Sequence, residues 1–237
     1  NEKGCWETPL NTPYTNVNDS ALTAIDPRNG DILAMVGGVD YNGTGNTTLD
    51  GGQNNVVISP YRSMGSSFKP IEYGTAMEMG WNPGTIIYDQ PTCFPVASSA
   101  EAQPYDAVLC PGHYLPHNDE YFHWIGPQPL HELLSNSLNT PAEETLSFVG
   151  MRTNADPLNI SPLIPMAERL GITTLKPSAM GYSTAIGTQA VPLLQLTSAY
   201  GTFADHGYRY PPRAILSIVR ADGVVKMPYQ AQPQGYQ

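Results

Sequence analysis

Basic residues and long apolar runs are both scarce in this sequence. It carries 11 Lys and Arg residues against 21 Asp and Glu residues, which gives a formal net charge of −10. Because proteins that bind nucleic acids contact phosphates through clustered Lys and Arg, this balance argues against a nucleic-acid partner. No stretch reaches the roughly eighteen uninterrupted apolar residues that a membrane-spanning helix needs, and no signal peptide is recognisable. Any membrane anchor would therefore lie outside this chain.

Cysteine is also rare, and occurs as Cys5, Cys93 and Cys110. No Cys-x-x-Cys pair is present, so a structural zinc site is not indicated. Cys93 and Cys110 flank a polar, loop-like stretch and would close it as a disulfide in an oxidising compartment. Two free thiols fit the same spacing equally well, and the sequence leaves both interpretations open.

Glycine and proline, by contrast, are plentiful, with 22 and 23 residues. They predict many turns and long irregular connections rather than a helical bundle. The patterns predict an α+β fold, with 1–19 as an irregular segment and 20–237 as one domain, of which 84–126 is mostly non-helical. The expected elements are hairpins at 21–36 and 214–227, the second turning at 221–223, and helices at 66–80, 130–139, 141–150, 162–171 and 191–207.

The stretch GSSFKP at 65–70 places Ser66 and Lys69 three residues apart at a predicted helix start. Pro70 has no backbone N–H, so the helix begins near Ser66, and residues three apart share one helix face. A neutral lysine amine can take the proton of a serine hydroxyl and make the oxygen a nucleophile. The spacing alone also fits a helix-capping serine followed by a solvated lysine. We interpret the pair as an acyl-transfer nucleophile and its base.

A second candidate pair is Ser137 and Asn139, in the stretch HELLSNSLNTPA at 131–142. A serine and an asparagine two residues apart at a helix–loop junction can both face one cleft. The hydroxyl can then relay a proton to a leaving group, and the carboxamide can bond a substrate amide. The pair gains weight from its position some seventy residues after Lys69.

The order of these segments resembles the transpeptidase domain of class A, bifunctional penicillin-binding proteins, whose active sites combine Ser-x-x-Lys, Ser-x-Asn and Lys-Thr-Gly. AIDPRNGDILAMVGG is similar to the entry hairpin of the family, GSSFKP to its nucleophile segment and NSLNTPA to its second motif. ERLGI and AIGTQAVPLLQLTSAYGTFADHG are similar to its later helices, so the resemblance covers about 20–225. It implies the penicillin-binding transpeptidase or serine β-lactamase-like fold, an antiparallel sheet flanked by helices.

The resemblance implies a role for each motif residue. Ser66 is expected to be the acylated nucleophile, with one oxyanion contact from its own backbone N–H, and Lys69 the activating base. Ser137 is expected to relay a proton, and Asn139 to hold the donor peptide or a β-lactam side chain. The implied partners are peptidoglycan stem peptides ending in D-Ala-D-Ala, an acceptor amine on a neighbouring stem, and β-lactam antibiotics. No cofactor and no metal is expected.

One motif of the family is absent, because no Lys-Thr-Gly or Lys-Ser-Gly occurs in this sequence. In the family that motif lies on a strand beyond the final hairpin, and a glycosyltransferase domain precedes the transpeptidase domain. We therefore expect a C-terminally incomplete domain, from a membrane-anchored parent protein, with weak or no activity of its own. The resemblance implies an extracytoplasmic location, in the periplasm or at the outer face of the cytoplasmic membrane.

Other functions remain alternatives at this point. A serine β-lactamase or D,D-carboxypeptidase of the same fold would need a base for a deacylating water, and no residue is assignable to that role. A catalytically inactive binding module would keep the fold without the chemistry. A metal site built from His113, His117 and His123, with Asp119 and Glu120, is disfavoured because Pro116 interrupts the segment.

Three glutamates are expected at the surface. Glu143 and Glu144 lie in the first turn of a predicted helix, where the helix dipole favours negative charge, and are expected to be solvated. Glu72 lies one turn beyond Lys69 and is expected to be a surface partner for that lysine.

Overall fold

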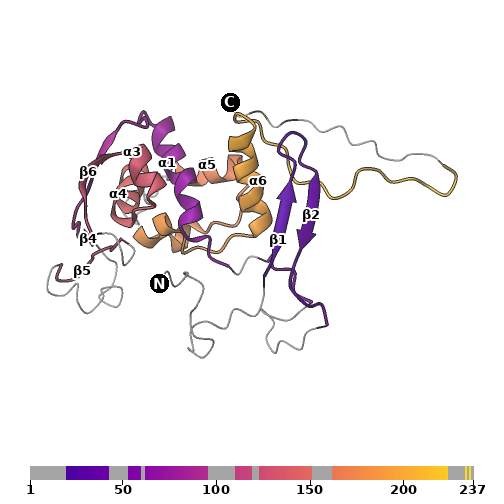
Figure 1. Ribbon diagram of the computed structural model, residues 1–237, viewed down its shortest axis with the longest axis horizontal. Coiled ribbons are helices and arrows are strands. Elements are labelled where there is room, and N and C mark those ends of the chain that lie inside the picture. Colours follow the sequence, from indigo (N-terminus) through magenta and orange to yellow (C-terminus); the bar gives the residue numbers. More distant parts are fainter. Residues whose placement is uncertain are drawn as a thin grey trace, which may run out of the picture.

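A computed structural model describes residues 20–42, 53–59, 62–95, 110–118, 123–150 and 162–223, together with positions 233 and 235. Helices gather around α1 in one part of the molecule, and the hairpin of β1 and β2 lies beside them, next to α6 (Figure 1). The strands are β1 Leu22–Ile25, β2 Ile32–Val36, β3 Ile86–Asp89, β4 Phe94–Pro95, β5 His113–Tyr114 and β6 Gly126–Pro129. The helices are α1 Lys69–Glu78, α3 Leu130–Ser135, α4 Asn139–Val149, α5 Leu163–Arg169 and α6 Leu193–Ala204, with short 3-10 helices η1 Gly65–Phe68, η2 Pro177–Ala179 and η3 Tyr182–Ile186.

The strands form three separate antiparallel pairs, β1 with β2, β3 with β6 and β4 with β5. The predicted first hairpin is confirmed, with Leu22 opposite Val36 and an irregularity in register after Ala24. The predicted turn at 221–223 is present, where Gly223 N–H donates to Arg220 O at 2.9 Å. The described residues of its first arm, 214–220, form no strand, and the second arm lies outside the described residues. Mixed helices and antiparallel strands confirm the predicted α+β class.

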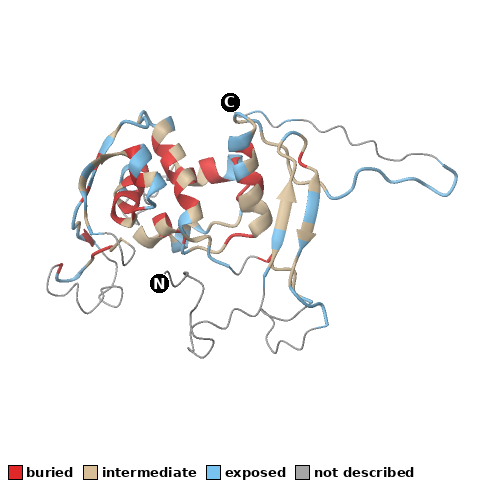
Figure 2. Ribbon diagram, in the orientation of Figure 1, coloured by how far each residue is buried: buried red, intermediate tan, exposed pale blue. Residues whose placement is uncertain are grey.

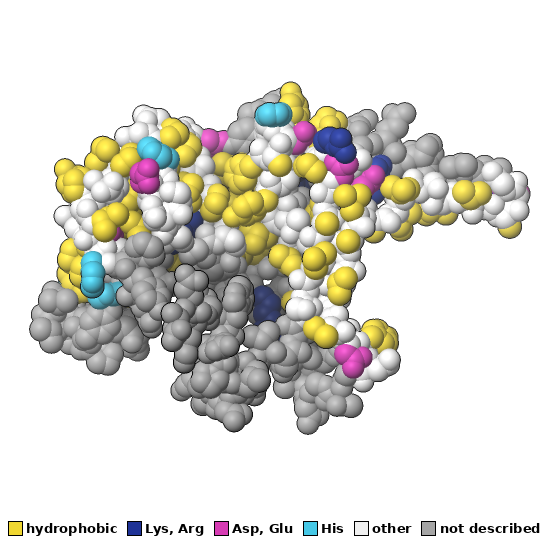
Figure 3. Space-filling model, in the orientation of Figure 1, with side chains coloured by type: hydrophobic (Ala, Val, Ile, Leu, Met, Phe, Trp, Pro, Cys, Tyr) yellow, Lys and Arg dark blue, Asp and Glu magenta, His cyan; other side chains and the backbone are white. Residues whose placement is uncertain are grey.

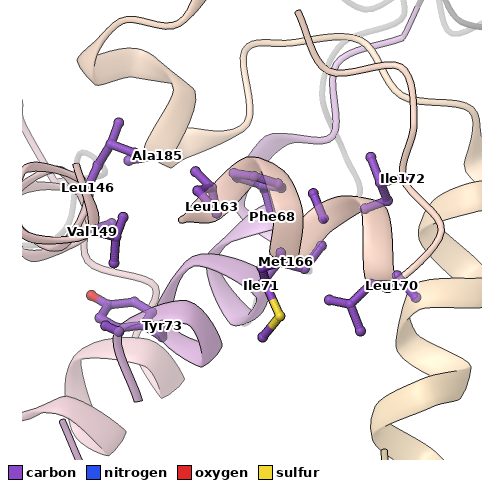
Figure 4. Close-up of a cluster of buried hydrophobic side chains, with 14 of the residues drawn as sticks. Phe68, Ile71, Tyr73, Leu146, Val149, Leu163, Met166, Leu170, Ile172 and Ala185 are labelled. Atoms are coloured by element: carbon purple, nitrogen blue, oxygen red, sulfur yellow. The ribbon is translucent and has the colours of Figure 1, made fainter. Parts of the chain in front are cut away.

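The hydrophobic core surrounds α1, which packs against α3, α4 and α5. Figure 4 shows Ile71 and Tyr73 of α1 among side chains from α4, α5 and the residues that follow α5. Phe68, Ile71 and Leu146 are fully buried, and each such side chain stabilises the fold by about 1.5–3 kcal/mol relative to exposure. Burial concentrates in these helices, whereas the β1–β2 hairpin is intermediate or exposed (Figure 2).

Helix boundaries follow the local sequence. The helix predicted to begin near Ser66 starts as the 3-10 turn η1, which continues directly into α1. Pro70 lies in the first turn of α1, where its missing N–H costs nothing. The helices predicted after Pro129, near 141, 162 and 191 are confirmed as α3, α4, α5 and α6. No helix in the described part of the chain is long and apolar enough to cross a membrane.

Cys93 and Cys110 form a disulfide, with their Cα atoms 5.6 Å apart. This resolves the choice between a disulfide and two free thiols in favour of the disulfide. The bond joins Cys93, which directly precedes β4, to Cys110, which lies shortly before β5. Cys5 and the segment 1–19, predicted to be irregular, lie outside the described residues.

Candidate active site

The segment that carries Ser66 is held in place by hydrogen bonds with Gly187 and Tyr200. Gly65 N–H donates to Gly187 O at 3.1 Å, and the Tyr200 hydroxyl donates to Ser67 O at 2.8 Å. Gly65 has a φ of +59°, a conformation that glycine adopts at no steric cost. Ser66 itself is exposed, and its hydroxyl makes no hydrogen bond to any described residue. Its oxygen is therefore open to an incoming substrate.

Ser137 sits in the tight turn between α3 and α4, with a φ of +56°. Its N–H donates to Leu134 O at 3.0 Å, and Leu138 N–H donates to Leu133 O at 3.1 Å. This pair of bonds is the Schellman pattern that closes helix C-termini, in which glycine usually occupies the left-handed position. Leu138 and Leu133 are both buried, as the pattern requires. A serine in this strained conformation is a feature that concentrates at functional sites.

Lys69 joins the two motifs, because the hydrogen bonds that its amine makes with described residues all go to the second one. Its Nζ donates to Ser137 O at 2.5 Å, to Asn139 Oδ1 at 2.7 Å and to Ser137 Oγ at 3.2 Å. These three acceptors match the three protons of an ammonium group. The structure therefore brings Lys69, Ser137 and Asn139 together, one turn of helix away from Ser66.

The Lys69 side chain is buried, with 1% of its surface exposed. Burial disfavours its charged form and lowers the pKa of Lys69 to about 8, while the carboxyl groups of Glu72 and Glu143 act in the opposite direction. A lysine with this pKa is neutral far more often at neutral pH than an exposed one. The first motif thus contains a lysine that is able to act as a base.

Asn139 is fixed by a network that the sequence motifs did not reveal. Its backbone N–H donates to Asn118 Oδ1 at 2.8 Å, and its side-chain Nδ2 donates to His117 O at 2.8 Å. Asn118 in turn donates from Nδ2 to both carboxylate oxygens of Asp89, at 2.9 and 3.0 Å. Asp89 is fully buried and also accepts from the N–H of Ile125 at 2.8 Å. Asp89 and Asn118 carry no local motif, and Asp89 lies fifty residues before Asn139, so only the fold identifies them.

The prediction of surface glutamates is wrong for Glu72 and Glu143, which are both fully buried. They lie between α1 and α4, where the packing of the two helices excludes water. Glu144 is half-buried rather than solvated, and its Oε1 accepts a hydrogen bond from Thr92 Oγ1 at 2.7 Å. The prediction that Glu143 and Glu144 lie in the first turn of their helix is also wrong, because α4 begins at Asn139 and its first turn contains no acidic residue. A helical pattern in the sequence does not reveal which face a neighbouring helix will cover.

The histidine-rich segment gives no support to the metal alternative. No group of three His, Cys, Asp or Glu side chains in the described part of the chain could hold a metal ion. Asp119 and Glu120 lie outside the described residues. His113 and His123 are exposed.

Residues 20–107 match the family described as the penicillin binding protein transpeptidase domain. Penicillin-binding protein 1A of Pseudomonas aeruginosa is 29% identical over 214 residues, which make up 90% of this chain and 22% of that protein. Penicillin-binding protein 1A from Haemophilus influenzae has a similar structure, with a TM-score of 0.70 and 22% identity over 92% of this chain and 28% of that one. The ceftriaxone acyl-enzyme complex of penicillin-binding protein A from Mycobacterium tuberculosis gives a TM-score of 0.65 and 21% identity over 91% and 52%.

The fold is therefore that of the transpeptidase domains of penicillin-binding proteins. The resemblance of the sequence to the class A members of this family is confirmed, and the chain is their relative over most of its own length. It spans about a quarter or less of the curated relatives' own length, with 22% of the Pseudomonas aeruginosa protein and 25% of penicillin-binding protein 2D of Bacillus subtilis.

Proposed function

We propose that this chain carries the acylation centre of a peptidoglycan D,D-transpeptidase, with Ser66 as the nucleophile and Lys69 as its base. The observation that carries the proposal is the buried Lys69 amine, which bonds to both Ser137 and Asn139 and has a pKa of about 8. Burial gives this lysine access to a neutral form, and the exposed Ser66 lies on the same helical turn. A solvent-exposed lysine would have neither the lowered pKa nor the bonds to Ser137 and Asn139.

The proposed first step transfers an acyl group from a stem peptide ending in D-Ala-D-Ala. The Ser66 hydroxyl oxygen attacks the carbonyl carbon of the penultimate D-Ala while its proton passes to the Lys69 amine. Ser137 then relays a proton to the nitrogen of the departing D-Ala, so that the amide bond breaks and an ester to Ser66 remains. The backbone N–H of Ser66 supports the oxyanion.

In the proposed second step an amine of a neighbouring stem peptide attacks the ester. A new amide cross-link forms, and the proton of the amine returns Ser66 to its hydroxyl form. A β-lactam enters the first step in the same way, but opening of its ring releases no fragment, so the acyl group stays on Ser66. The relative from Mycobacterium tuberculosis was solved as a ceftriaxone acyl-enzyme complex, which supports this chemistry here.

Ser137 Oγ is suited to the relay because it makes the longest of the three contacts with Lys69, at 3.2 Å. When Lys69 is neutral, its lone pair can accept a hydrogen bond, and the Ser137 hydroxyl can reverse its role and donate. Asn139 keeps one carboxamide proton beyond its bond to His117 O. That proton is the proposed contact with the donor peptide or the β-lactam side chain.

The proposed setting is the periplasm or the outer face of the cytoplasmic membrane, where peptidoglycan is cross-linked. The disulfide between Cys93 and Cys110 supports it, since disulfides persist in oxidising compartments. We further propose, from the resemblance of the sequence to the class A family, that the parent protein is membrane-anchored and carries a glycosyltransferase domain.

Labelling of the full-length parent protein with a fluorescent penicillin tests the proposal, because this chain lacks Lys-Thr-Gly and is expected to have weak or no activity of its own. The parent protein should form a covalent adduct that persists for hours, its Ser66→Ala variant should form none, and Ser67→Ala should still be labelled. Ser67 is the matched control because its hydroxyl only donates to Met64 O at 2.6 Å.

Three outcomes would contradict the proposal. Equal labelling of Ser66→Ala would remove Ser66 as the nucleophile. Rapid release of hydrolysed penicillin would favour a β-lactamase or carboxypeptidase. A folded parent protein that forms no adduct would favour an inactive binding module.

A further inference from the structure

Two glutamates beside Lys69 are fully buried and have no role in the proposed reaction. Glu72 on α1 and Glu143 on α4 are both 0% exposed. Glu143 Oε1 accepts a hydrogen bond from the Tyr114 hydroxyl at 2.9 Å. Among the residues that the structure describes, Glu143 Oε2 and both carboxyl oxygens of Glu72 have no hydrogen-bond partner. A buried carboxylate without donors is costly, so such a group persists only with compensation.

The compensation available is the charge of Lys69. Glu72 follows Lys69 by three residues on α1 and shares its helix face, and α4 brings Glu143 against the same helix. Lys69 donates its hydrogen bonds to uncharged acceptors, and no ion pair within the described residues joins it to a carboxylate. The nearby glutamates act on Lys69 through space instead.

The buried group of Lys69, Glu72 and Glu143 is unfavourable both with two ionised glutamates and with two neutral ones. Two carboxylates would repel each other in a water-excluded site, and two neutral carboxyls would leave the buried Lys69 ammonium without a counter-charge. Burial raises the pKa of Glu143 to about 8 and that of Glu72 well above its ordinary value, and the charge of Glu143 raises the pKa of Glu72 further. One negative charge balances Lys69 and avoids the repulsion.

The other titratable groups around the pair do not supply this charge. Burial raises the pKa of the Tyr73 hydroxyl, which is therefore neutral, and Glu144 faces Thr92. The remaining charged or titratable side chains on the surrounding elements are Asp89, bound to Asn118, the half-buried Tyr182 of η3, and the exposed Glu78, Tyr88, His131, Glu132, Glu168 and Arg169 of α1, β3, α3 and α5.

We propose that Glu72 and Glu143 form a single carboxyl pair that holds at most one negative charge, and that this charge sets how readily Lys69 gives up its proton. The two glutamates are positioning residues, because they act on the reaction through Lys69 and touch no reacting atom. The proposal deepens the proposed function, since it assigns control of the base. Either glutamate alone can carry the single charge. The proposal therefore predicts that replacing one glutamate changes the titration of Lys69 little, whereas replacing both changes it strongly.

Titration of Lys69 by NMR tests the pair directly. The chain contains four lysines, so labelling lysine with 13C at Cε gives few signals, and Lys69→Arg assigns the one from Lys69. In the wild-type chain this signal should titrate near pH 8. Glu72→Gln and Glu143→Gln should each leave the midpoint within about 0.5 pH unit, while the double variant should lower it by about one unit or more.

Glu144→Gln is the matched control, since Glu144 neighbours Glu143 on α4 but bonds to Thr92, and it should not move the midpoint. The proposal is overturned if the double variant titrates like the wild type. It is equally overturned if each single variant contributes half of the shift, because the two charges would then be independent. Should the double variant fail to fold, the glutamate carboxyl signals of the wild-type chain decide, because two midpoints below about pH 5 would exclude a shared charge.

Acylation by a fluorescent penicillin adds a functional readout. If Lys69 is the base, the midpoint of the rate against pH should fall in the double variant by the same amount as the NMR midpoint, because the neutral amine then forms at lower pH. A full-length parent protein that does not acylate at all would count against the proposed function. The NMR titration would still decide the carboxyl pair, so the two failures are distinguishable.

Discussion

The two segments that build the site are fixed by different kinds of contact. The segment that carries Ser66 is held largely through backbone atoms, by the close approach of Gly65 and Gly187 and by the Tyr200 bond to a carbonyl. The turn that carries Ser137 and Asn139 is held by a helix-capping pattern and by polar side chains. The first should therefore be sensitive to added atoms, and the second to the loss of polar atoms.

Gly187→Ala should have the largest effect. Gly187 has a φ of +74°, and a Cβ there would lie 2.0 Å from Gly65 O. We expect the free energy of unfolding to fall by about 2–5 kcal/mol, from the strained backbone and the overlap, and the penicillin acylation rate to fall as well. Chemical denaturation measures the first. Gly181→Ala is the control, because a Cβ there meets nothing within 4 Å; equal losses at both positions would refute the close-approach argument.

Asp89→Asn should come next, and should act on the second segment. The carboxylate accepts from Asn118 and from the N–H of Ile125, and an amide in its place turns one acceptor into a donor that faces other donors. We expect a loss of about 1–3 kcal/mol of stability and slower acylation, because Asn139 is no longer held. The same change at the exposed Asp40 should cost little. If Asp89→Asn lowers stability but leaves the acylation rate unchanged, the hydrogen bonds of Asp89 and Asn118 do not position Asn139 for the reaction.

The pH dependence of stability follows from the buried groups near Lys69. The pKa of Glu143 is raised from 4.5 to about 8 on folding, so its stabilising contribution is present below about pH 4.5 and is lost as the pH rises to 8. The pKa of Lys69 is lowered from 10.5 to about 8, so stability is regained between pH 8 and 10.5. Each group contributes a slope of up to about 1.4 kcal/mol per pH unit. The raised pKa of Glu72 adds to the loss below pH 8 and opposes the gain above it. Denaturation from pH 5 to 8 should therefore show a steady fall in stability, and a steady rise through that range would contradict it.

Ser137→Gly should have the smallest effect on stability, and the opposite sign. Glycine adopts the φ of +56° without strain, so we expect a gain of about 1 kcal/mol in unfolding free energy. Acylation should nevertheless slow, because the hydroxyl that faces Lys69 is gone. Ser137→Ala removes the same hydroxyl and keeps the strain, so it should be the less stable of the two. If both variants acylate at the wild-type rate, Ser137 is not the proton relay.

Much of the fold could be predicted because its signals are local. Apolar spacing and turn residues located the first hairpin and the helices, and Pro70 located the start of α1. The second hairpin was predicted in the same way, yet its described arm forms no strand. Several apolar side chains of β1 and β2 remain exposed, such as Leu33 at 69% and Leu22 at 54%. Figure 3 shows hydrophobic side chains on the surface of this hairpin. Strand pairing depends on partners distant in sequence, which a local pattern does not reveal.

The candidate site was predicted only where chemistry and short spacing coincide. The sequence indicated Ser66, Lys69, Ser137 and Asn139, and the structure brings the last three into direct contact. It did not indicate Asp89 or Asn118, because their role depends on three distant segments meeting. The sequence predicted Glu72 and Glu143 at the surface, because the periodicity of a helix does not reveal which neighbouring helix will cover it.

The most direct test of the central claim is to locate the penicillin adduct by mass spectrometry. The full-length parent protein is incubated with benzylpenicillin and digested, and the modified peptide is sequenced. The account predicts one adduct, equal to the mass of the intact antibiotic, on Ser66, with its rate reduced by at least about a hundredfold in Lys69→Met because the base is lost. An adduct on any other residue, or an unchanged rate in Lys69→Met, would contradict it.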